Sequence, residues 1–419
     1  MKKTLLFCLM SLSLSAQAAN LLPPGSRDQA PSRLVSAPAP AGEFERKPVA
    51  FAWALDPWAE LEAPAPFVAE SREYWALAEA SEMQAGLSID TTAPGALIRV
   101  SPAAGSDAVE PGQLRMLRNG KAIAEPETFA RRANAAQLKA AGMEVPDGSA
   151  IVQLAPEQGK GRFQVQLAEA KGRYLVHVFE PNSEYVLKAQ AGRRSVLAGD
   201  TLEVSADLAN GTSKMAGGEV GGSLISPSGR SYDLAFRNGK AQIQVPDEAG
   251  TTPGLWEVHL SSASFDQGAS IQRDARTAVE VTRPTARLGG GYRFDAAAVR
   301  FELPVQVAAA GRYELRGTLF ATGADGVARP VAQAHAANWF EPGARQLSLA
   351  FGRGNVPSGF GAPYELRFVE LKDQARMGTL ETRELAVRGA GATPTPRAVR
   401  PRDAAAPGRG TAGRETSIR

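Results

Sequence analysis

Cysteine is almost missing from this sequence, and histidine is scarce. The one cysteine, Cys8, lies near the N-terminus, so the remaining chain can form no disulfide, has no thiol nucleophile and offers no cysteine ligand to a metal. The three histidines, His177, His259 and His335, lie far apart in the sequence and form no local ligand cluster. We therefore expect no metal site and no cofactor.

Catalytic motifs are missing as well. The chain contains no Walker A loop, dinucleotide-binding fingerprint, nucleophile elbow or zinc-protease motif. Aspartates near predicted turns, such as Asp200 and Asp325, lack the spacing of an EF-hand, so solvated turn carboxylates are the simpler interpretation. A Ser-His-Asp site could form only between residues of different domains. We therefore expect a protein that is not an enzyme.

Long apolar runs are confined to the N-terminus. Met1-Lys2-Lys3 precedes an apolar stretch over residues 4–14, and Ser15-Ala16-Gln17-Ala18 supplies the small residues of a cleavage site. These features predict a signal peptide over residues 1–18. The stretch is shorter than the roughly 20 residues that span a bilayer, and no later run could span one. The mature protein is therefore expected to be exported, periplasmic or extracellular, with no integral membrane segment.

Neither sign of charge dominates. The chain has 47 lysine and arginine residues against 44 aspartate and glutamate residues, and residues 389–419 alone hold six arginines and two acids. The rest of the chain is nearly neutral and lacks the excess of positive charge that is typical of nucleic-acid-binding proteins. The Pro- and Arg-rich tail, residues 389–419, is predicted to be disordered, because it has too few apolar residues to offset the entropy of ordering. Residues 19–48 lack periodicity and are predicted to form a flexible lead.

A short strand motif recurs along the chain. A glycine, a second residue and a large aromatic residue precede alternating apolar residues, starting at Gly172, Gly254 and Gly311. Alternation with period two predicts strands with one buried face, on which Tyr174, Trp256 and Tyr313 point inward. Late strands of immunoglobulin-like sandwiches have this pattern.

The sequence predicts a mostly β protein with three domains in tandem. Residues 49–184 are expected to form an N-terminal α+β domain with one substantial helix over residues 126–141, and residues 185–284 and 285–388 two Ig-like β-sandwiches. The aromatic residues near the start of the first domain are interpreted as core and edge packing: Phe51, Trp53, Trp58, Phe67, Tyr74 and Trp75.

The later parts of the chain resemble known exported modules. Residues 313–320, 347–351 and 361–373 are similar to the last β-sandwich of many exported bacterial proteins, although Ala362 interrupts the usual Gly-Pro-Tyr. Residues 198–201 and 254–258 are similar to bacterial Ig-like modules fused to secreted proteases and surface proteins. The mature chain resembles an uncharacterised family of exported proteins with a mixed N-terminal domain and two Ig-like domains, catalogued as a domain of unknown function. The resemblance implies no catalytic or ligand-binding residue.

These features favour a non-catalytic protein that binds a protein or a glycan in the envelope or outside the cell. Two alternatives remain open. One is an accessory protein or inhibitor of an exported enzyme such as a protease, because similar modules accompany such enzymes. The other is an unrecognised hydrolase in the N-terminal domain.

The expected ligand site is one corner of the C-terminal domain, formed by His335, Asn338, Trp339 and Phe340. Alanines alternate with Gln333 and His335 along this strand, and their small size suits packing against a second sheet, so His335 is expected to face outward. Trp339 and Phe340 either form an exposed interaction surface or plug the end of the sandwich. The first interpretation makes this corner the partner-binding surface.

Overall fold

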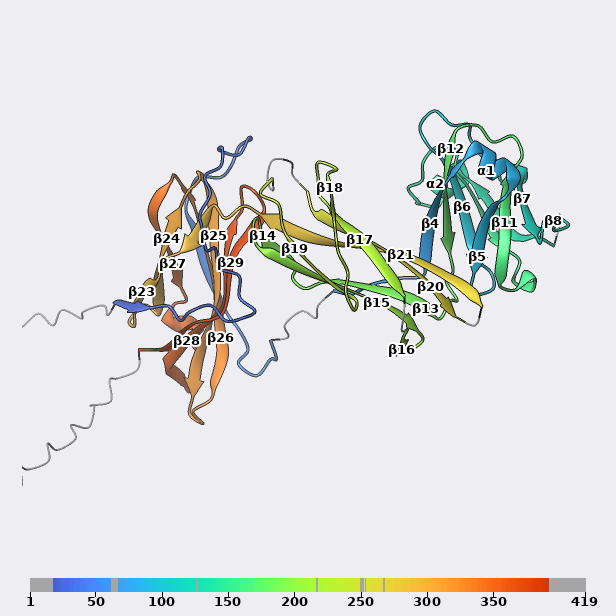
Figure 1. The fold of residues 1–419 in the computed structure, drawn as a ribbon. Coiled ribbons are helices and arrows are strands. Elements are labelled where there is room, and N and C mark those ends of the chain that lie inside the picture. The colour runs from blue at the N-terminus through green and yellow to red at the C-terminus, as the bar shows by residue number, and fades with distance from the viewer. Residues whose placement is uncertain are drawn as a thin grey trace, which may run out of the picture.

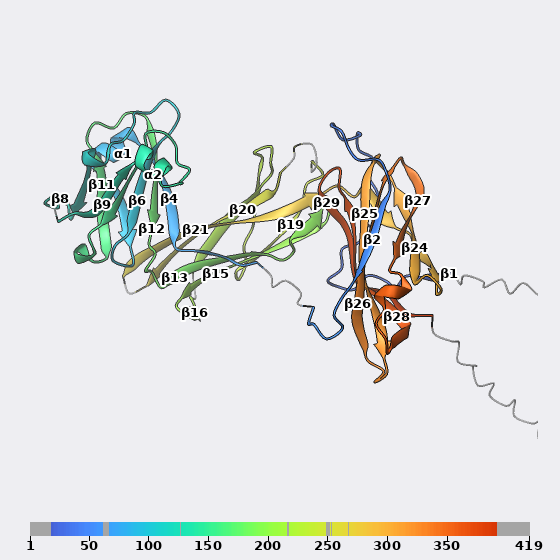
Figure 2. The ribbon, with the colours of Figure 1, turned by 180° about the vertical axis from the view of Figure 1, so that it is seen from behind.

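The computed structural model describes residues 18–61, 67–125, 127–215, 218–248, 252, 254–266 and 268–391. Antiparallel strands dominate, and three separate hydrophobic cores follow one another along an elongated molecule (Figure 1; Figure 2). This confirms the prediction of a mostly β fold. The cores are built largely from residues of the three predicted ranges, 49–184, 185–284 and 285–388.

The N-terminal domain packs two sheets against each other. One layer has the order β4-β12-β6-β10-β9 and is part of a ten-stranded sheet that continues into the middle domain, and the other layer is the sheet β5-β11-β7-β8. Alternate residues such as Ile98, Phe163 and Tyr174 point between the sheets and are fully buried. The elements of this domain are β4 (Glu73–Glu79), α1 (Ala80–Ala85), β5 (Leu87–Thr91), β6 (Leu97–Pro102), β7 (Leu114–Arg118), β8 (Lys121–Ala122), β9 (Phe129–Asn134), α2 (Ala135–Ala140), β10 (Ala150–Leu154), β11 (Gly161–Leu167) and β12 (Arg173–Phe179).

The long helix predicted over residues 126–141 is wrong for most of its length. Residues 129–134 form β9, which pairs with β10 and extends the sheet by one strand. Helix α2 has only six residues, and Asn134 caps its N-terminus. The Asn134 side chain accepts a hydrogen bond from the Gln137 N–H group, and the Gln137 side chain accepts one from the Asn134 N–H group. Sheet pairing therefore overrides the helix propensity of this alanine-rich segment.

The middle domain is a second sandwich. Its elements are β13 (Tyr185–Ala191), β14 (Ser195–Leu197), β15 (Thr201–Asn210), β16 (Ser213–Lys214), β17 (Glu219–Ile225), β18 (Ser231–Asp233), β19 (Lys240–Gln244), β20 (Trp256–Asp266) and β21 (Ala269–Thr282). Trp256 is 2% exposed, as its inward position predicts, and stacks on Tyr232. Asn238 and Gly239 form a turn with positive φ at both residues, 53° and 76°, as a type I′ turn requires.

The C-terminal domain pairs a five-stranded sheet, in the order β2-β26-β25-β28-β29, with a second sheet built around β24. Its elements are β22 (Ala286–Leu288), β23 (Gly291–Asp295), β24 (Arg300–Val307), β25 (Gly311–Gly323), β26 (Ala328–Phe340), β27 (Gly343–Ala350), β28 (Phe360–Asp373) and β29 (Gly378–Ala390). Strand β29 extends into the predicted tail, because Ala390 still pairs with Tyr364. Residues 392–419 lie outside the described residues.

The N-terminal segment is not a free lead but an integral part of the later domains. Strand β1 (Ala18–Asn20) pairs with β23, and β2 (Val49–Ala54) pairs with β26, so both belong to the C-terminal domain. Strand β3 (Ala69–Ser71) then pairs with β13 of the middle domain before β4 enters the N-terminal domain. The predicted boundary at residue 49 therefore does not hold, since strand pairing is non-local and this segment has no periodicity to reveal it.

A buried polar cluster joins the N-terminal and middle domains. The Arg273 guanidinium of β21 lies 2.8 Å from the Glu180 carboxylate, which follows β12, and both side chains are fully buried. Arg273 also donates hydrogen bonds to the side chains of Thr92 and Ser183 at 2.9 and 2.8 Å. A buried charge needs such partners, so this contact fixes how the two domains meet.

Candidate functional site

The outer face of the C-terminal sheet carries the candidate site. Along β26, Ala332, Ala334 and Ala336 are buried, whereas Gln333 and His335 are half-buried on the opposite face. This alternation confirms the predicted direction of His335. The same alternation turns Asn338 and Phe340 inward, where Phe340 stacks on the buried Tyr313. The four predicted site residues therefore do not form one surface, and only His335 and Trp339 face outward.

Strand β2 brings two further aromatic rings to His335. Phe51 lies directly opposite His335 in the strand pair, and Trp53 lies opposite Gln333. The His335 ring centroid is 5.2 Å from that of Phe51 and 5.2 Å from that of Trp53, with planes inclined by 9° and 25°. Phe51 is 53% exposed and Trp53 is 39% exposed. We refer to Phe51, Trp53 and His335 as the aromatic surface.

The sequence alone predicted that Phe51 and Trp53 pack in the first domain, and it did not reveal their contact with His335. A signal was present, because the residues of β2 read Val-Ala-Phe-Ala-Trp-Ala, with large apolar side chains alternating with alanine. That pattern is typical of a strand with one small face. Only the three-dimensional pairing with β26 shows to which domain it belongs.

Polar side chains from β25 border the aromatic surface. The Glu314 carboxylate lies 2.6 Å from His335 Nδ1 and accepts a second hydrogen bond from Gln374 Nε2 at 2.7 Å. Gln333 donates to the Thr318 hydroxyl at 3.4 Å, and Arg316 forms an ion pair with Glu370 at 2.7 Å. Because a carboxylate only accepts hydrogen bonds, His335 Nδ1 carries the proton in this pair, and the Nε2 atom is left for another partner.

Trp339 lies further along the same face, past Ala337. Its ring packs against Phe44 with centroids 5.9 Å apart, and the Arg46 guanidinium lies 4.4 Å from its centroid. The indole N–H donates to Glu341 at 2.9 Å. The residues 44–46 that cover Trp339 belong to the N-terminal segment, so this tryptophan is held in place by packing and is less open than Phe51 or Trp53.

The other two histidines do not join this surface. His177 pairs with Glu73 at 2.8 Å in the N-terminal domain, and His259 pairs with Glu257 at 2.6 Å in the middle domain. Among the described residues, no group of three histidine, cysteine, aspartate or glutamate side chains could hold a metal ion. No helix within the described ranges is long and apolar enough to cross a bilayer.

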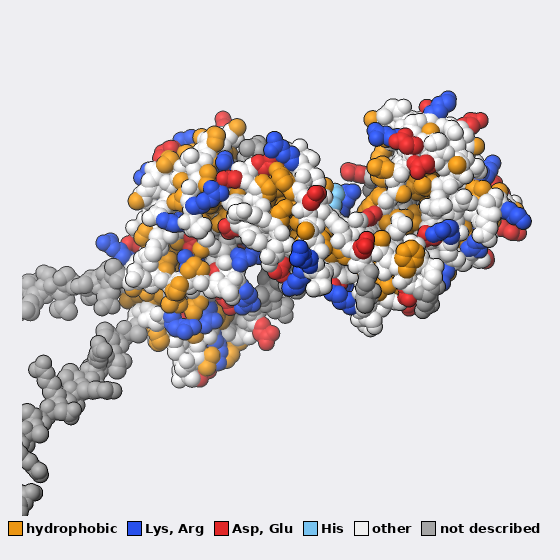
Figure 3. All heavy atoms as spheres, viewed as in Figure 1, with side chains coloured by type: hydrophobic (Ala, Val, Ile, Leu, Met, Phe, Trp, Pro, Cys, Tyr) orange, Lys and Arg blue, Asp and Glu red, His pale blue; other side chains and the backbone are white. Residues whose placement is uncertain are grey.

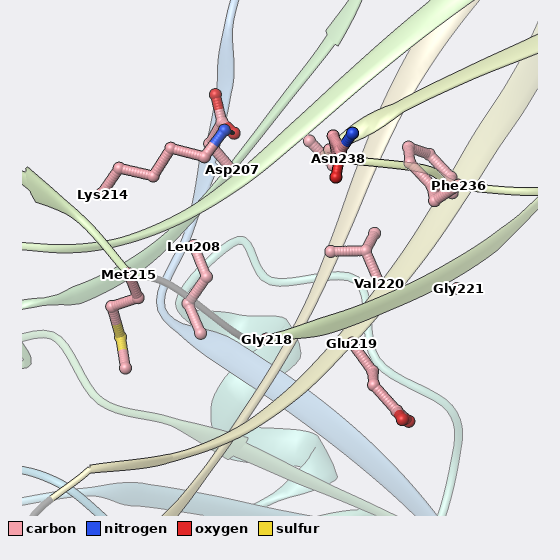
Figure 4. Close-up of a pocket in the computed structure, with 12 residues that line it drawn as sticks. Asp207, Leu208, Lys214, Met215, Gly218, Glu219, Val220, Gly221, Phe236 and Asn238 are labelled. Atoms are coloured by element: carbon pink, nitrogen blue, oxygen red, sulfur yellow. Dashed lines mark ion pairs between the residues drawn. The ribbon is translucent and has the colours of Figure 1, made fainter.

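A pocket also opens at the edge of the middle domain, between β15, β16 and β17 (Figure 4). Asp207 and Lys214 form an ion pair on one side of it, and Val220 and Phe236 lie on the other. Glu219 also lines the pocket, so its lining carries two acidic residues and one lysine. Over the molecular face seen in Figure 3, Lys and Arg side chains are likewise interspersed with Asp and Glu.

Comparisons with known proteins agree on one family. Residues 40–180 match the N-terminal domain, and residues 285–389 the C-terminal domain, of the domain of unknown function DUF4785. The crystal structure of a DUF4785 family protein from Legionella pneumophila is similar over 86% of this chain and 99% of that chain, with a TM-score of 0.68 and 21% sequence identity. This likeness concerns the fold.

A weaker likeness to trypsin-activated α-2-macroglobulin from Escherichia coli, with 14% identity over 66% of this chain and 21% of that chain, has a TM-score of 0.19 and supports no argument. No curated protein matches the sequence. The two domain matches together cover more than half of the chain, and they assign it to the DUF4785 family.

Proposed function

We propose that the protein is an exported, non-catalytic binding protein that binds a glycan through the aromatic surface of its C-terminal domain. The observation that supports this proposal is the set of three near-parallel rings, Phe51, Trp53 and His335, of which Phe51 and Trp53 are largely exposed. Large exposed aromatic side chains beside fixed polar groups are typical of interaction surfaces.

The chemistry of a sugar ring fits this arrangement. The C–H groups on one face of a pyranose pack on a flat aromatic surface, and its hydroxyl groups point to the sides, where they need hydrogen-bond partners. Here the partners are the Nε2 atom of His335, the Gln333 amide and the Arg316 guanidinium, all on the same sheet face. Such partners prevent a loss of hydrogen bonds when the hydroxyl groups leave water.

The role of Glu314 supports binding rather than hydrolysis. Both of its carboxylate oxygens are engaged, one by His335 and the other by Gln374, whose side chain also accepts from Arg312 at 3.0 Å. A carboxylate fixed in this way orients the histidine ring. It is not free to protonate a leaving group or to activate water, as glycoside hydrolysis requires of two carboxyl groups.

A glycan array tests the proposal, with four forms of the protein lacking residues 1–18: the wild type, Phe51→Ala, Trp53→Ala and Trp58→Ala. Trp58 is the control, because it lies in the same N-terminal segment and is 70% exposed but contacts Arg329 and Phe360 instead of His335. We expect Trp53→Ala to bind the glycan at least tenfold more weakly than the wild type, a loss of at least about 1.4 kcal/mol of binding free energy. Trp58→Ala should bind it as tightly as the wild type.

Equal binding by all four forms, or no binding by the wild type to any glycan, would contradict the proposal. A protein that co-purifies with the wild type from the cell envelope but not with Trp53→Ala would assign the same surface to a protein partner instead of a glycan.

A further inference from the structure

A second surface feature lies on the N-terminal domain, on the outer face of the sheet β4-β12-β6-β10-β9. Strand pairing aligns one row of outward side chains across it, because His177 lies opposite Arg99, Arg99 opposite Ile151, and Ile151 opposite Ala133. The neighbouring row contains Phe179 and Leu97. The aligned rows form the floor of a cavity of about 440 Å³.

Helix α2 and the turn after it form a wall of this cavity. Leu138 of α2 is 6% exposed, and Met143 in the turn is 44% exposed; both line the cavity. With Leu97, Ile151 and Phe179 on the floor, most of the lining is apolar. The volume lies within the roughly 300–1,000 Å³ typical of small-molecule sites, which combine an apolar lining with a few polar groups.

The charges in the cavity are all of one sign. Arg99, Arg131 and Arg132 line it, and no aspartate or glutamate does. Arg132 is paired with Glu125 at 2.8 Å, outside the lining. By contrast, the buried Nε atom of Arg99 has no hydrogen-bond partner among the described residues. A buried N–H group without a partner is costly, and a guanidinium binds a carboxylate through two parallel hydrogen bonds.

We propose that this cavity binds an amphipathic carboxylate, a molecule of fatty-acid type whose chain packs on Leu97, Ile151 and Phe179 and whose carboxylate pairs with Arg99, assisted by Arg131. The apolar floor and wall exclude a fully polar anion, because such a ligand would leave the apolar lining in contact with its polar groups. The absence of acidic lining residues disfavours a cation. This site is separate from the aromatic surface, which lies on another domain.

The test titrates the protein with three ligands that share a ten-carbon chain and differ in the head group: decanoate, decan-1-ol and decylammonium. Isothermal titration calorimetry is used below the micelle concentration, with the full mature chain. We expect decanoate to bind at least tenfold more tightly than decan-1-ol, and decylammonium to bind more weakly than both.

Two variants and a control identify the residues that bind the carboxylate head group. Arg99→Gln and Arg131→Gln are each expected to reduce the preference for decanoate over decan-1-ol, Arg99→Gln by tenfold or more. Because Arg131 is exposed, its substitution leaves the fold intact even if Arg99→Gln disturbs it. Arg173→Gln is the control, since Arg173 is an exposed residue of β12 outside the cavity and should leave the affinity unchanged.

Three results would overturn the proposal: no binding of decanoate to the wild type, equal affinities for decanoate and decan-1-ol, or equal losses in Arg131→Gln and Arg173→Gln. Trp53→Ala should bind decanoate like the wild type. A failure of glycan binding at the aromatic surface therefore leaves this test unaffected, and a failure here leaves the proposed glycan site unaffected.

Discussion

Trp256 fills the core of the middle domain, where its ring is 2% exposed and lies 5.9 Å from that of Tyr232. Trp256→Ala is expected to lower the free energy of unfolding of this domain by about 3–5 kcal/mol, because it removes buried apolar area and leaves a cavity. Phe265→Ala is the matched control: Phe265 belongs to the same strand, β20, but is 77% exposed.

Denaturant unfolding followed by circular dichroism compares the two variants. Phe265→Ala should stay within about 0.5 kcal/mol of the wild type, as for other exposed positions. If the two substitutions cost the same, the inward direction of Trp256 is incorrect.

Asp274 makes stability depend on pH at the junction of β21 and β4. Its carboxylate accepts a hydrogen bond from the Trp75 backbone N–H group at 2.7 Å. Burial raises the pKa of this carboxyl above its ordinary value of 3.8, and the hydrogen bond and nearby Arg276 offset only part of the rise. The folded state therefore holds this proton to higher pH than the unfolded chain does. The contribution of the protonated Asp274 to the free energy of unfolding is complete below pH 3.8, and it is lost as the pH rises through the raised pKa.

Asp274→Asn keeps an acceptor for the Trp75 N–H group and cannot ionise. We expect this variant to melt at a higher temperature than the wild type at neutral pH and at the same temperature in acid below the ordinary pKa. Thermal melts between neutral pH and a pH below 3.8 measure the difference in melting temperature between the variant and the wild type. A lower melting temperature for the variant at neutral pH would mean that the ionised carboxylate stabilises the junction.

At the level of single residues, the sequence predicted the face to which a strand side chain points better than it predicted which residues lie beside that side chain. Period-two alternation correctly turned Trp256 and Tyr313 inward and His335 outward. Applied strictly, it would also have separated His335 from Phe340, which has the opposite parity on the same strand. No local pattern could place Phe51 beside His335, because 284 positions separate them and only strand pairing brings them together.

Among the elements, β2 has the largest consequence for the C-terminal domain. It pairs with β26 over six residues and forms the edge of the sheet. A shortened chain that begins at residue 57 loses both β1 and β2, and we expect the C-terminal domain to lose a few kcal/mol of stability, since each ladder hydrogen bond contributes about 1 kcal/mol net. The exposed edge of β26 should also promote aggregation.

Hydrogen exchange resolves this effect by domain. Amides of β26 should lose protection in the shortened chain, whereas those of β12 in the N-terminal domain should not change. The control removes residues 392–419 instead and should leave the exchange of β26 as in the wild type. Unchanged protection of β26 without β2 would show that the N-terminal segment adds nothing to this domain.

The elements also show why the sequence misled at residues 129–134. An alanine-rich segment is compatible with a helix, and a short helix does form at its end, where Asn134 and Gln137 cap α2. The helix begins later because the preceding residues complete a sheet edge beside β10. Hairpin turns, by contrast, depend on local backbone chemistry, and both Asn-Gly pairs, at residues 119 and 238, have the positive φ angles that such turns need.

For the whole molecule, the buried pair Arg273 and Glu180 connects the N-terminal and middle domains. Burial lowers the pKa of Arg273, opposed by the Glu180 carboxylate, and an arginine stays charged even so. Glu180→Ala is therefore expected to cost about 3–5 kcal/mol, because it leaves a buried guanidinium without its counter-ion. The double variant Glu180→Leu with Arg273→Met should recover only part of that loss, because the backbone N–H groups of Thr92 and Ala93 still lack the Glu180 carboxylate as acceptor.

Calorimetry measures the stability of these variants, and small-angle X-ray scattering follows the separation of the domains. Glu180→Ala should broaden the distribution of distances within the molecule. If its stability and scattering match the wild type, the pair does not fix the junction.

Export is the second prediction for the whole molecule. Ala16 and Ala18 provide the small residues that a signal peptidase recognises, so the mature chain should begin at Ala19. Intact-mass measurement on protein recovered from the cell envelope or the medium checks this. Protein there that retains residues 1–18 would contradict it.

The proposed binding of a glycan to the aromatic surface can be tested directly through the five tryptophans of the chain, Trp53, Trp58, Trp75, Trp256 and Trp339, which lie in all three domains. Each contributes one indole N–H signal to a proton–nitrogen correlation spectrum, and single substitutions assign the signals. On titration with a glycan selected on the array, we expect the Trp53 signal to shift progressively while those of Trp58, Trp75 and Trp256 stay in place. A spectrum in which Trp75 shifts and Trp53 does not would place the binding site on the N-terminal domain and contradict the proposed site.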